Sequence, residues 1–185
     1  DTFDGRTIAA GFGTTSSGYQ YTVLAPSTDY TVSGGVATQT VTTAGSFRRA
    51  RLLLADISVA DQDFVVEWSC PAATGASLEP ANMSLRTQDA SNDYLLRVLV
   101  TTANEVQVAI FRNYTGTAGG TTMLNNTTVP GLVFDAGSHW FTRYQAIGST
   151  IRIRVWKDGT VEPRIWHGSV RDRTFAAGAW GLRSG

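Results

Sequence analysis

YLLRVLVTTANEVQVAIFR, residues 94–112, contains two apolar runs that flank a short polar segment. Both runs are rich in Val, Ile and Leu, and turn-forming residues fill 101–105, so we expect a β-hairpin. Helical periodicity is almost absent from the chain, whereas strand-like stretches recur at regular spacing. These stretches are 19–24, 30–41, 49–59, 64–70, 139–147 and 151–157. The pattern predicts ten to fourteen strands joined by Gly-rich turns, which is typical of an all-β sandwich or barrel.

The length and charge of the chain restrict its class. A chain of 185 residues can build one sizeable core, so we expect a single β-sandwich domain over 1–185. Fifteen basic residues balance fifteen acidic ones, and without a basic excess we expect no nucleic-acid partner. No window of 18 apolar residues exists, so we expect no membrane insertion. The first residues lack the basic region and apolar run of a signal peptide.

The cysteine and the histidines are candidates for chemistry that we interpret as structural. Cys70 is the only cysteine, so no internal disulfide is possible. It continues the apolar alternation of 64–70, which predicts a buried small side chain. His139 and His167 adjoin tryptophans and have no partner at metal-ligand or triad spacing, so each is interpreted as a hydrogen-bonded structural histidine.

The segment IRIRVWKDGTVEPRIW, residues 151–166, predicts a second hairpin, closed by a three-residue loop with Gly159 in a left-handed conformation. This loop length places every apolar residue on one face. The predicted pairs are Val155 with Val161, Ile153 with Pro163, Ile151 with Ile165, and Arg154 with Glu162. The opposite face then carries six polar and aromatic residues, namely Arg152, Arg154, Trp156, Glu162, Arg164 and Trp166.

That face of the hairpin has two interpretations. It is a cross-strand ladder with the tryptophans packed under a neighbouring loop, or it is a ligand-binding surface. In the second interpretation, Trp156 and Trp166 stack on sugar rings, and the arginines beside them donate hydrogen bonds. The stretches 70–83 and 113–131 are expected to be loops, and Asn113 and Tyr114 of the second are candidates to extend the binding surface.

No enzyme motif is present. The sequence has no Gly-x-Ser-x-Gly, P-loop, Cys-x-x-Cys or dinucleotide fingerprint. Glycoside hydrolysis needs two carboxylates that face each other, but the central strands offer Glu67 alone, and Asp61 and Asp63 are expected in a loop. We therefore expect no catalytic residues. A calcium ion held by Asp1, Asp4 and Asp172 is chemically reasonable, but no defined calcium loop supports it.

Both ends of the chain carry motifs of a known family. The opening DTFDGRT, GFGTTSSGYQYTV and YTVSGGVA, and the closing RIRVWKDGTVEPRIW and GAWGLRSG, resemble concanavalin A-like (laminin G-like) sandwich domains of actinobacteria and their phages. The resemblance implies a two-sheet antiparallel jelly roll. The laminarinase branch of this superfamily has a Glu-x-Asp-x-x-Glu strand, and the nearest stretch here, VVEWSCP, lacks it. A further strand commonly follows Gly-Leu-Arg-Ser in such domains, so we expect a segment of a longer chain.

The resemblance implies three functional hypotheses. The first is a non-catalytic carbohydrate-binding or adhesion module of a phage tail or secreted bacterial protein, extracellular or on the virion, whose partner is a cell-surface glycan or polysaccharide. The second is a structural assembly domain of a phage tail, which contacts neighbouring tail or host-protein chains or copies of itself. The third is a glucanase-like hydrolase, which would require two carboxylates about 5–10 Å apart in a groove.

Overall fold

The computed structural model describes residues 2–23, 26–41, 48–52, 57–71, 77–116 and 120–184. These residues form thirteen strands and one short 3₁₀ turn, η1 (Ser27–Asp29). The strands are β1 (Tyr21–Val23), β2 (Tyr30–Ser33), β3 (Val36–Gln39), β4 (Arg48–Leu52), β5 (Gln62–Ser69), β6 (Asn82–Thr87), β7 (Asp93–Val100), β8 (Glu105–Asn113), β9 (Thr121–Val133), β10 (His139–Ile147), β11 (Thr150–Lys157), β12 (Gly168–Arg171) and β13 (Ala179–Ser184). The strand number and the all-β class are as predicted.

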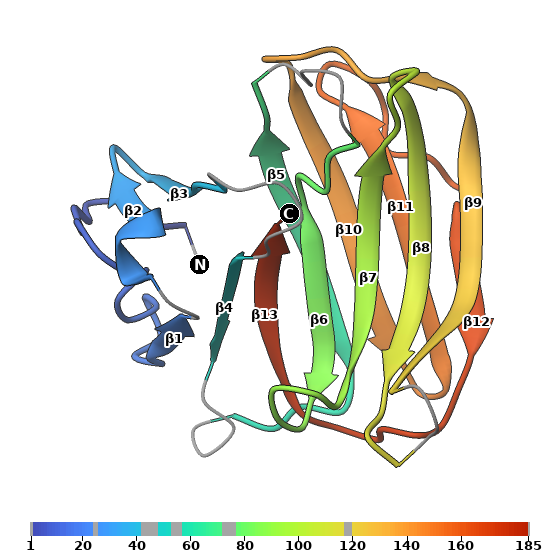
Figure 1. Cartoon of the computed structure of the whole chain (residues 1–185), viewed down its shortest axis with the longest axis horizontal. Coiled ribbons are helices and arrows are strands. Elements are labelled where there is room, and N and C mark those ends of the chain that lie inside the picture. The colour runs from blue at the N-terminus through green and yellow to red at the C-terminus, as the bar shows by residue number, and fades with distance from the viewer. Residues whose placement is uncertain are drawn as a thin grey trace.

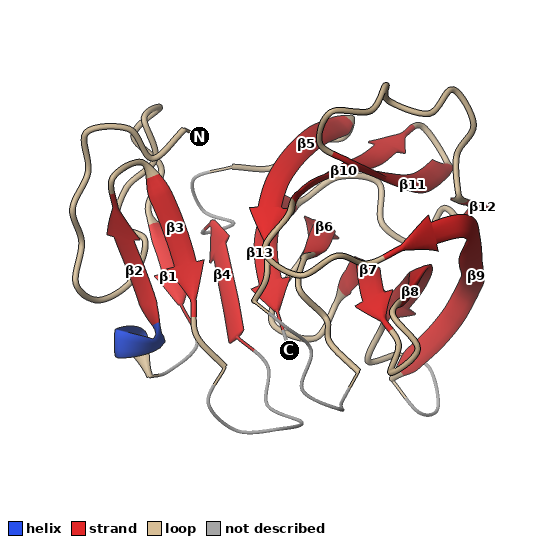
Figure 2. Ribbon diagram, turned by 90° about the horizontal axis from the view of Figure 1, so that it is seen from above, coloured by secondary structure: helices blue, strands red, loops and turns tan. Residues whose placement is uncertain are grey.

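Two antiparallel sheets form the sandwich. The larger has the strand order β1-β4-β13-β6-β7-β8-β9, and the smaller has the order β12-β11-β10-β5. Figure 2 shows the four-stranded sheet as one layer and the seven-stranded sheet as the other. Strands β2 and β3 form a small separate sheet beside β1 and β4, at the N-terminal side of the molecule (Figure 1). The fold is a two-sheet antiparallel jelly roll.

The main core lies between the two sheets. Alternate residues of β7, β8, β10 and β11 point inward, as the period of two along a strand requires. Trp140 stacks against both Trp68 and Phe134, with ring centroids 5.8 and 5.9 Å away. A second cluster around Phe12, Tyr21 and Tyr30 packs the N-terminal part. Because the inward residues are apolar, the site must be sought on the outer faces, the turns and the rims.

The hairpin over 94–112 is confirmed, since β7 pairs with β8 from Asp93↔Asn113 to Val100↔Val106. The turn inside 30–41 is also formed, with Gly34 and Gly35 both at positive φ. Of the predicted strand 49–59, residues 49–52 belong to β4, and residues 53–56 lie outside the described residues. Residue 24 of the predicted strand 19–24 also lies outside them. Cys70 is half-buried against the core, and this burial raises the pKa of its thiol.

The predicted pairing of 151–157 with 161–166 is wrong. Strand β11 pairs instead with β12, with Ile151 opposite Val170 and Ile153 opposite Gly168. Val161 and Ile165, expected in the core, are 90% and 72% exposed. Pro163 explains part of the error, because it has no N–H to donate to a strand ladder.

Glycine at residue 168 explains the register that forms. A Cβ built there would lie 2.7 Å from Asn125 Oδ1 and 3.0 Å from Ile153 Cγ2, so a larger residue would require these side chains to shift. Gly159 does adopt the predicted left-handed conformation, with φ of 78°.

The predicted loop over 113–131 is wrong for 121–131, because 121–133 is strand β9, which pairs with β8. Residues 114–116 belong to no strand, as predicted, and 117–119 lie outside the described residues. Its Thr-rich, apolar-poor sequence hides the strand from a hydrophobic pattern, yet threonine suits a sheet with one exposed face. The loop predicted over 70–83 overlaps β6 by two residues, and its residues 72–76 lie outside the described residues.

Candidate functional site

Trp156, a predicted ligand-binding residue, is largely buried. It lies on the outer face of the four-stranded sheet, opposite Phe141 in the pairing of β10 with β11. The two rings stack with centroids 5.6 Å apart and planes 18° apart, and only 8% of Trp156 is exposed. The stacking face that a sugar would need is therefore occupied by Phe141.

Trp166 lies beside two of the predicted arginines and is half-buried. The guanidinium carbons of Arg152 and Arg154 each lie 4.3 Å from its ring centroid, which is a cation–π geometry. Arg154 also forms an ion pair with Glu162 and donates to the Pro163 carbonyl at 2.6 Å. These contacts correspond to the ladder interpretation, although the strand register differs.

Arg143 of β10, which sequence reasoning missed, organises the rest of this face. Its guanidinium donates to both carboxylate oxygens of Asp63, at 2.7 and 3.0 Å, and to Glu162 at 3.1 Å. Partial burial alone would raise the pKa of Asp63, but hydrogen bonds from Arg143 and Gln145 hold that pKa below its usual value. Arg143 thus ties the 158–167 loop to the sheet. Of the remaining predicted residues here, Arg164 is exposed.

Asn113 and Tyr114 lie at the end of β8, on the other sheet from the hairpin residues. Asn113 donates to Asp93 Oδ1 at 2.6 Å and accepts from Thr121 at 2.9 Å. The ring of Tyr114 meets Phe175 edge-on, with centroids 5.8 Å apart. Five of the seven predicted binding residues therefore lie on β11 or in the loop that follows it, and the other two lie at the end of β8. Their role in binding stays a prediction.

The outer face of the seven-stranded sheet carries a second polar group that the sequence did not reveal. One row of cross-strand partners runs Arg49↔Arg183↔Asn82↔Arg97↔Ala109 from β4 to β8. Leu96 and Val98 point into the core, so Arg97 between them points outward. We call this surface the arginine face. It consists of Arg49, Asn82, Ser84, Asp93, Arg97, Phe111 and Arg183.

The arginine face has an apolar floor and arginines above it. Leu95, Ala109 and Phe111 form a separate buried cluster on this side of the sheet. The guanidinium carbon of Arg97 lies 4.8 Å from the Phe111 ring centroid, and the side chain of Arg97 is 24% exposed. Arg97 also donates to Glu79 at 2.9 Å, so its guanidinium contacts both the apolar floor and an acidic neighbour.

Several buried polar atoms of the arginine face have no hydrogen-bond partner among the described residues. They are Arg49 Nε, Ser84 Oγ, Asp93 Oδ2 and Arg97 Nε. Arg49 donates to the Ala90 carbonyl at 2.7 Å, but its Nη2 lies 3.8 Å from Asp93. A buried polar group without a partner costs about 1–3 kcal/mol, so such a concentration needs a reason.

The arginine face brings three guanidinium groups together with the carboxylates of Glu79 and Asp93. Burial, and secondly the charge of nearby Arg49, lower the pKa of Arg183, while Asp93 and Glu79 act in the opposite direction. Two carboxylates against three guanidinium groups leave a local positive excess on a chain whose net charge is zero.

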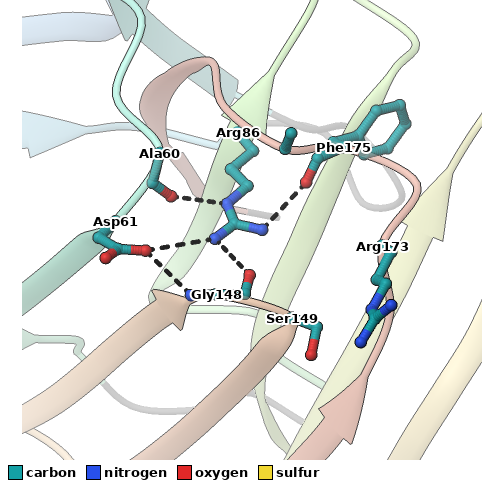
Figure 3. Close-up of a pocket in the computed structure, with 8 residues that line it drawn as sticks. Ala60, Asp61, Arg86, Gly148, Ser149, Arg173 and Phe175 are labelled. Atoms are coloured by element: carbon teal, nitrogen blue, oxygen red, sulfur yellow. Dashed lines mark hydrogen bonds and ion pairs between the residues drawn. The ribbon is translucent and has the colours of Figure 1, made fainter.

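A pocket of about 370 Å³ lies between the β10–β11 turn and residues 173–176 (Figure 3). Arg86, in a left-handed conformation with φ of 47°, reaches along it. Its guanidinium donates to the carbonyls of Ala60, Phe175 and Gly148 at 2.7–3.0 Å. Because these carbonyls already take its donors, Arg86 ties three loops together, and we interpret it as structural.

Asp63 and Glu67, the two carboxylates of β5, are not placed as a hydrolytic pair. Asp63 belongs to β5, which corrects its predicted loop position, and it shares the outer face with Glu67. Four residues along one strand separate them by about 13 Å, more than either glycosidase geometry uses. The lowered pKa of Asp63 is also the wrong direction for a general acid.

The proposed calcium residues lie in different parts of the chain. Asp172 accepts from Tyr94 and from Arg112 at 2.5 and 2.7 Å, Asp4 lies beside the Gly34–Gly35 turn, and Asp1 is outside the described residues. Within the described ranges, no group of three or more His, Cys, Asp or Glu is placed to hold a metal ion. Nor does any helix there have the length and apolarity to span a membrane.

The two histidines make hydrogen bonds, as predicted. His139 Nδ1 lies 2.6 Å from Glu67, and His167 accepts from the Val155 N–H at 3.2 Å. Burial, and secondly the charge of Arg154, lower the pKa of His167. Among the described residues, neither histidine belongs to a group of three or more His, Cys, Asp or Glu that could hold a metal ion.

Comparison with solved structures supports the fold. The chain is similar to the carbohydrate-binding module CBM66 from Bacillus subtilis, with a TM-score of 0.55 and 16% identity over 76% of this chain and 75% of that one. It is similar to the CBM2 module of the evolved Dit of Lactobacillus casei BL23 phage J-1, with a TM-score of 0.56 and 11% identity over 84% and 70%.

A third similar structure is a glycoside hydrolase family 16 endo-glucanase from Bacteroides ovatus, with a TM-score of 0.59 and 8% identity over 100% of this chain and 83% of that one. These structures are concanavalin A-like jelly rolls, so the resemblance read from the sequence is confirmed for the fold. No family model and no curated protein matches the sequence.

Proposed function

We propose that the protein is a non-catalytic carbohydrate-binding or adhesion module, part of a phage tail or fibre or of a secreted bacterial protein, and therefore extracellular or on the virion. The observation that carries the proposal is the arginine face, where an apolar floor lies beneath polar groups without partners. Sugar rings combine an apolar C–H face with a rim of hydroxyls, so they complement both parts. The similar carbohydrate-binding modules support the same function.

Arg97 and Arg183 are the partly exposed members of this surface, and Arg97 lies nearer to β9. Next to it, exposed Asn126 of β9 continues the row of Arg97 and Ala109. A glycan that approaches from the β9 side meets Arg97 first, and rotation of Arg97 off the Phe111 ring would expose that ring. The hairpin face around Trp166 is a second candidate surface, favoured by a tryptophan that is half-exposed between two arginines.

A glycan array with one variant from each face tests the proposal. Arg97→Gln removes one of the three guanidinium groups of the arginine face, and Trp166→Ala removes the more exposed of the two tryptophans of the hairpin face. We expect the wild type to bind at least one glycan, Arg97→Gln to weaken that binding about tenfold or more, and Trp166→Ala to retain it. Thermal unfolding of each variant verifies that it folds.

Three results would change the proposal. Loss of binding in Trp166→Ala alone would indicate that the binding site lies on the hairpin face. Absence of any glycan binding by folded wild type would overturn the carbohydrate function and favour the structural tail domain, whose contacts are with protein chains. Release of reducing sugar from a bound glucan would support the glucanase-like alternative.

A further inference from the structure

We propose that the glycan bound by the arginine face is anionic, with carboxylate or phosphate groups received by Arg49, Arg97 and Arg183. This inference rests on the proposed carbohydrate-binding function and specifies the class of ligand.

The first argument is the arrangement of like charges. Arg49 and Arg183 are direct cross-strand partners, and Arg97 follows one strand beyond Asn82 in the same row. Like charges directly opposite each other in a sheet are destabilising. Glu79 and Asp93 offset part of the repulsion among the three guanidinium groups, and an anionic ligand would offset the positive excess that remains.

The second argument is the direction of the missing hydrogen bonds. Nε of Arg49 and Nε of Arg97 are N–H donors without an acceptor among the described residues, and Ser84 Oγ beside them is a hydroxyl that can donate. Carboxylate and phosphate oxygens accept several such bonds, and the planar guanidinium fork matches them in pairs. Three of the four unpartnered atoms named above can donate, and only Asp93 Oδ2 is an acceptor, so an anionic ligand supplies most of the missing partners.

The third argument separates a glycan from other anions. Leu95, Ala109 and Phe111 give the face an apolar floor, which a free inorganic anion does not use but a sugar ring does. The chain has no net charge, so a general attraction of polyanions is not expected. Binding of an anion here would depend on this local group of arginines.

The experiment measures binding of the wild type to three probes by affinity electrophoresis and calorimetry. The probes are polygalacturonate, which carries carboxylates, its methyl-esterified form, which has the same backbone without those charges, and a phosphorylated mannan. A glycan array with neutral and anionic members extends the search, and a single-stranded DNA oligonucleotide serves as a non-glycan polyanion.

We expect binding to at least one anionic glycan, at least a tenfold loss when its charges are esterified or removed, and a similar loss in Arg97→Gln. Arg97→Lys, which keeps the charge but not the planar fork, should retain part of the affinity. Arg173→Gln is the matched control, since Arg173 is an exposed arginine between β12 and β13, and it should bind like the wild type.

The outcomes separate the two proposals. Binding of neutral glycans only, weakened by Arg97→Gln, would overturn the anionic ligand and leave the carbohydrate function intact. Equal binding of DNA and anionic glycan, or equal loss in Arg173→Gln, would also overturn the inference, because attraction would then be non-specific. No binding to any glycan would overturn both. The carboxylate and phosphate probes distinguish the two sources of negative charge.

Discussion

The outer faces of the two sheets carry similar residues, but the polar groups of these residues are paired to different extents on the two faces. On the four-stranded sheet, Arg143 links Asp63 to Glu162, and the aromatic rings have partners. On the seven-stranded sheet, Arg49 and Ser84 keep buried polar atoms without partners among the described residues. Arg154 Nε on the four-stranded sheet is also buried without a partner, but the arginine face gathers four such atoms, Arg49 Nε, Ser84 Oγ, Asp93 Oδ2 and Arg97 Nε. Because each unpartnered group costs free energy, we interpret the face that gathers them as the one prepared for a ligand.

The difference predicts that substitutions on the four-stranded sheet reduce stability and leave binding intact. The largest effect is expected for Trp156→Ala. Its buried indole stacks on Phe141, so its removal should lower the free energy of unfolding by about 3 kcal/mol. Urea denaturation measures this loss. If Trp156→Ala were as stable as the wild type but lost glycan binding, the comparison of the two faces would be reversed.

Arg143→Met is expected to have the next effect. The substitution keeps most of the side-chain volume but breaks the link between Asp63 and the 158–167 loop. Because these groups are about one-third exposed, we expect a loss of only about 1–2 kcal/mol, together with faster proteolysis in that loop. The exposed Arg173→Met is the matched control. Equal stability of both variants would show that the Arg143 link contributes nothing.

Trp166→Ala should have a smaller effect, about 0.5–1 kcal/mol, because it removes two cation–π contacts of a half-buried ring. Differential scanning calorimetry measures the shift in Tm. Trp166→Phe keeps an aromatic face for Arg152 and Arg154 and should recover part of the loss. A drop of several kcal/mol would instead show that Trp166 anchors the loop.

The smallest effect is a change of stability with pH. The folded-state pKa of Asp63 is lowered, so its contribution is present above its unfolded pKa of about 3.9 and is lost as the pH falls through the folded-state value. Asp63→Asn should therefore be less stable than the wild type at pH 6, and the difference should vanish in strong acid. A difference that stays constant down to pH 2 would contradict the role of the charge.

The sequence predicted the fold better than the site. Apolar alternation located the long central strands, including β7, β8, β10 and β11, because each buries one face in the core. Apolar alternation gave a wrong prediction where the alternating residues are not buried. Val161, Pro163 and Ile165 alternate like a strand, yet they lie in a loop held by Glu162. Strand β9 was missed because six of its thirteen residues are Thr or Asn and because Pro130 and Gly131 lie within it.

The arginine face could not be read from the sequence because its members are far apart along the chain. Arg97 interrupts the apolar run YLLRVLV, and this polar residue in a central strand was the available signal. Its meaning depends on Arg49 and Arg183, which meet it only through the order β4-β13-β6-β7. Local periodicity predicts which face of a strand a residue occupies. The order of the strands in the sheet decides which of these residues lie side by side.

The most direct test of the difference between the faces is the Ser84→Ala substitution, with stability and glycan affinity measured on the same protein. Ser84 is 1% exposed, and its hydroxyl has no partner among the described residues. Thr142→Val is the control, because the Thr142 hydroxyl accepts from Trp68 at 2.9 Å and its loss should cost about 1–3 kcal/mol.

We predict that Ser84→Ala keeps or slightly raises the free energy of unfolding and weakens binding of the glycan found on the array. A variant that loses stability as Thr142→Val does, with its glycan affinity unchanged, would contradict a ligand-binding role for the arginine face.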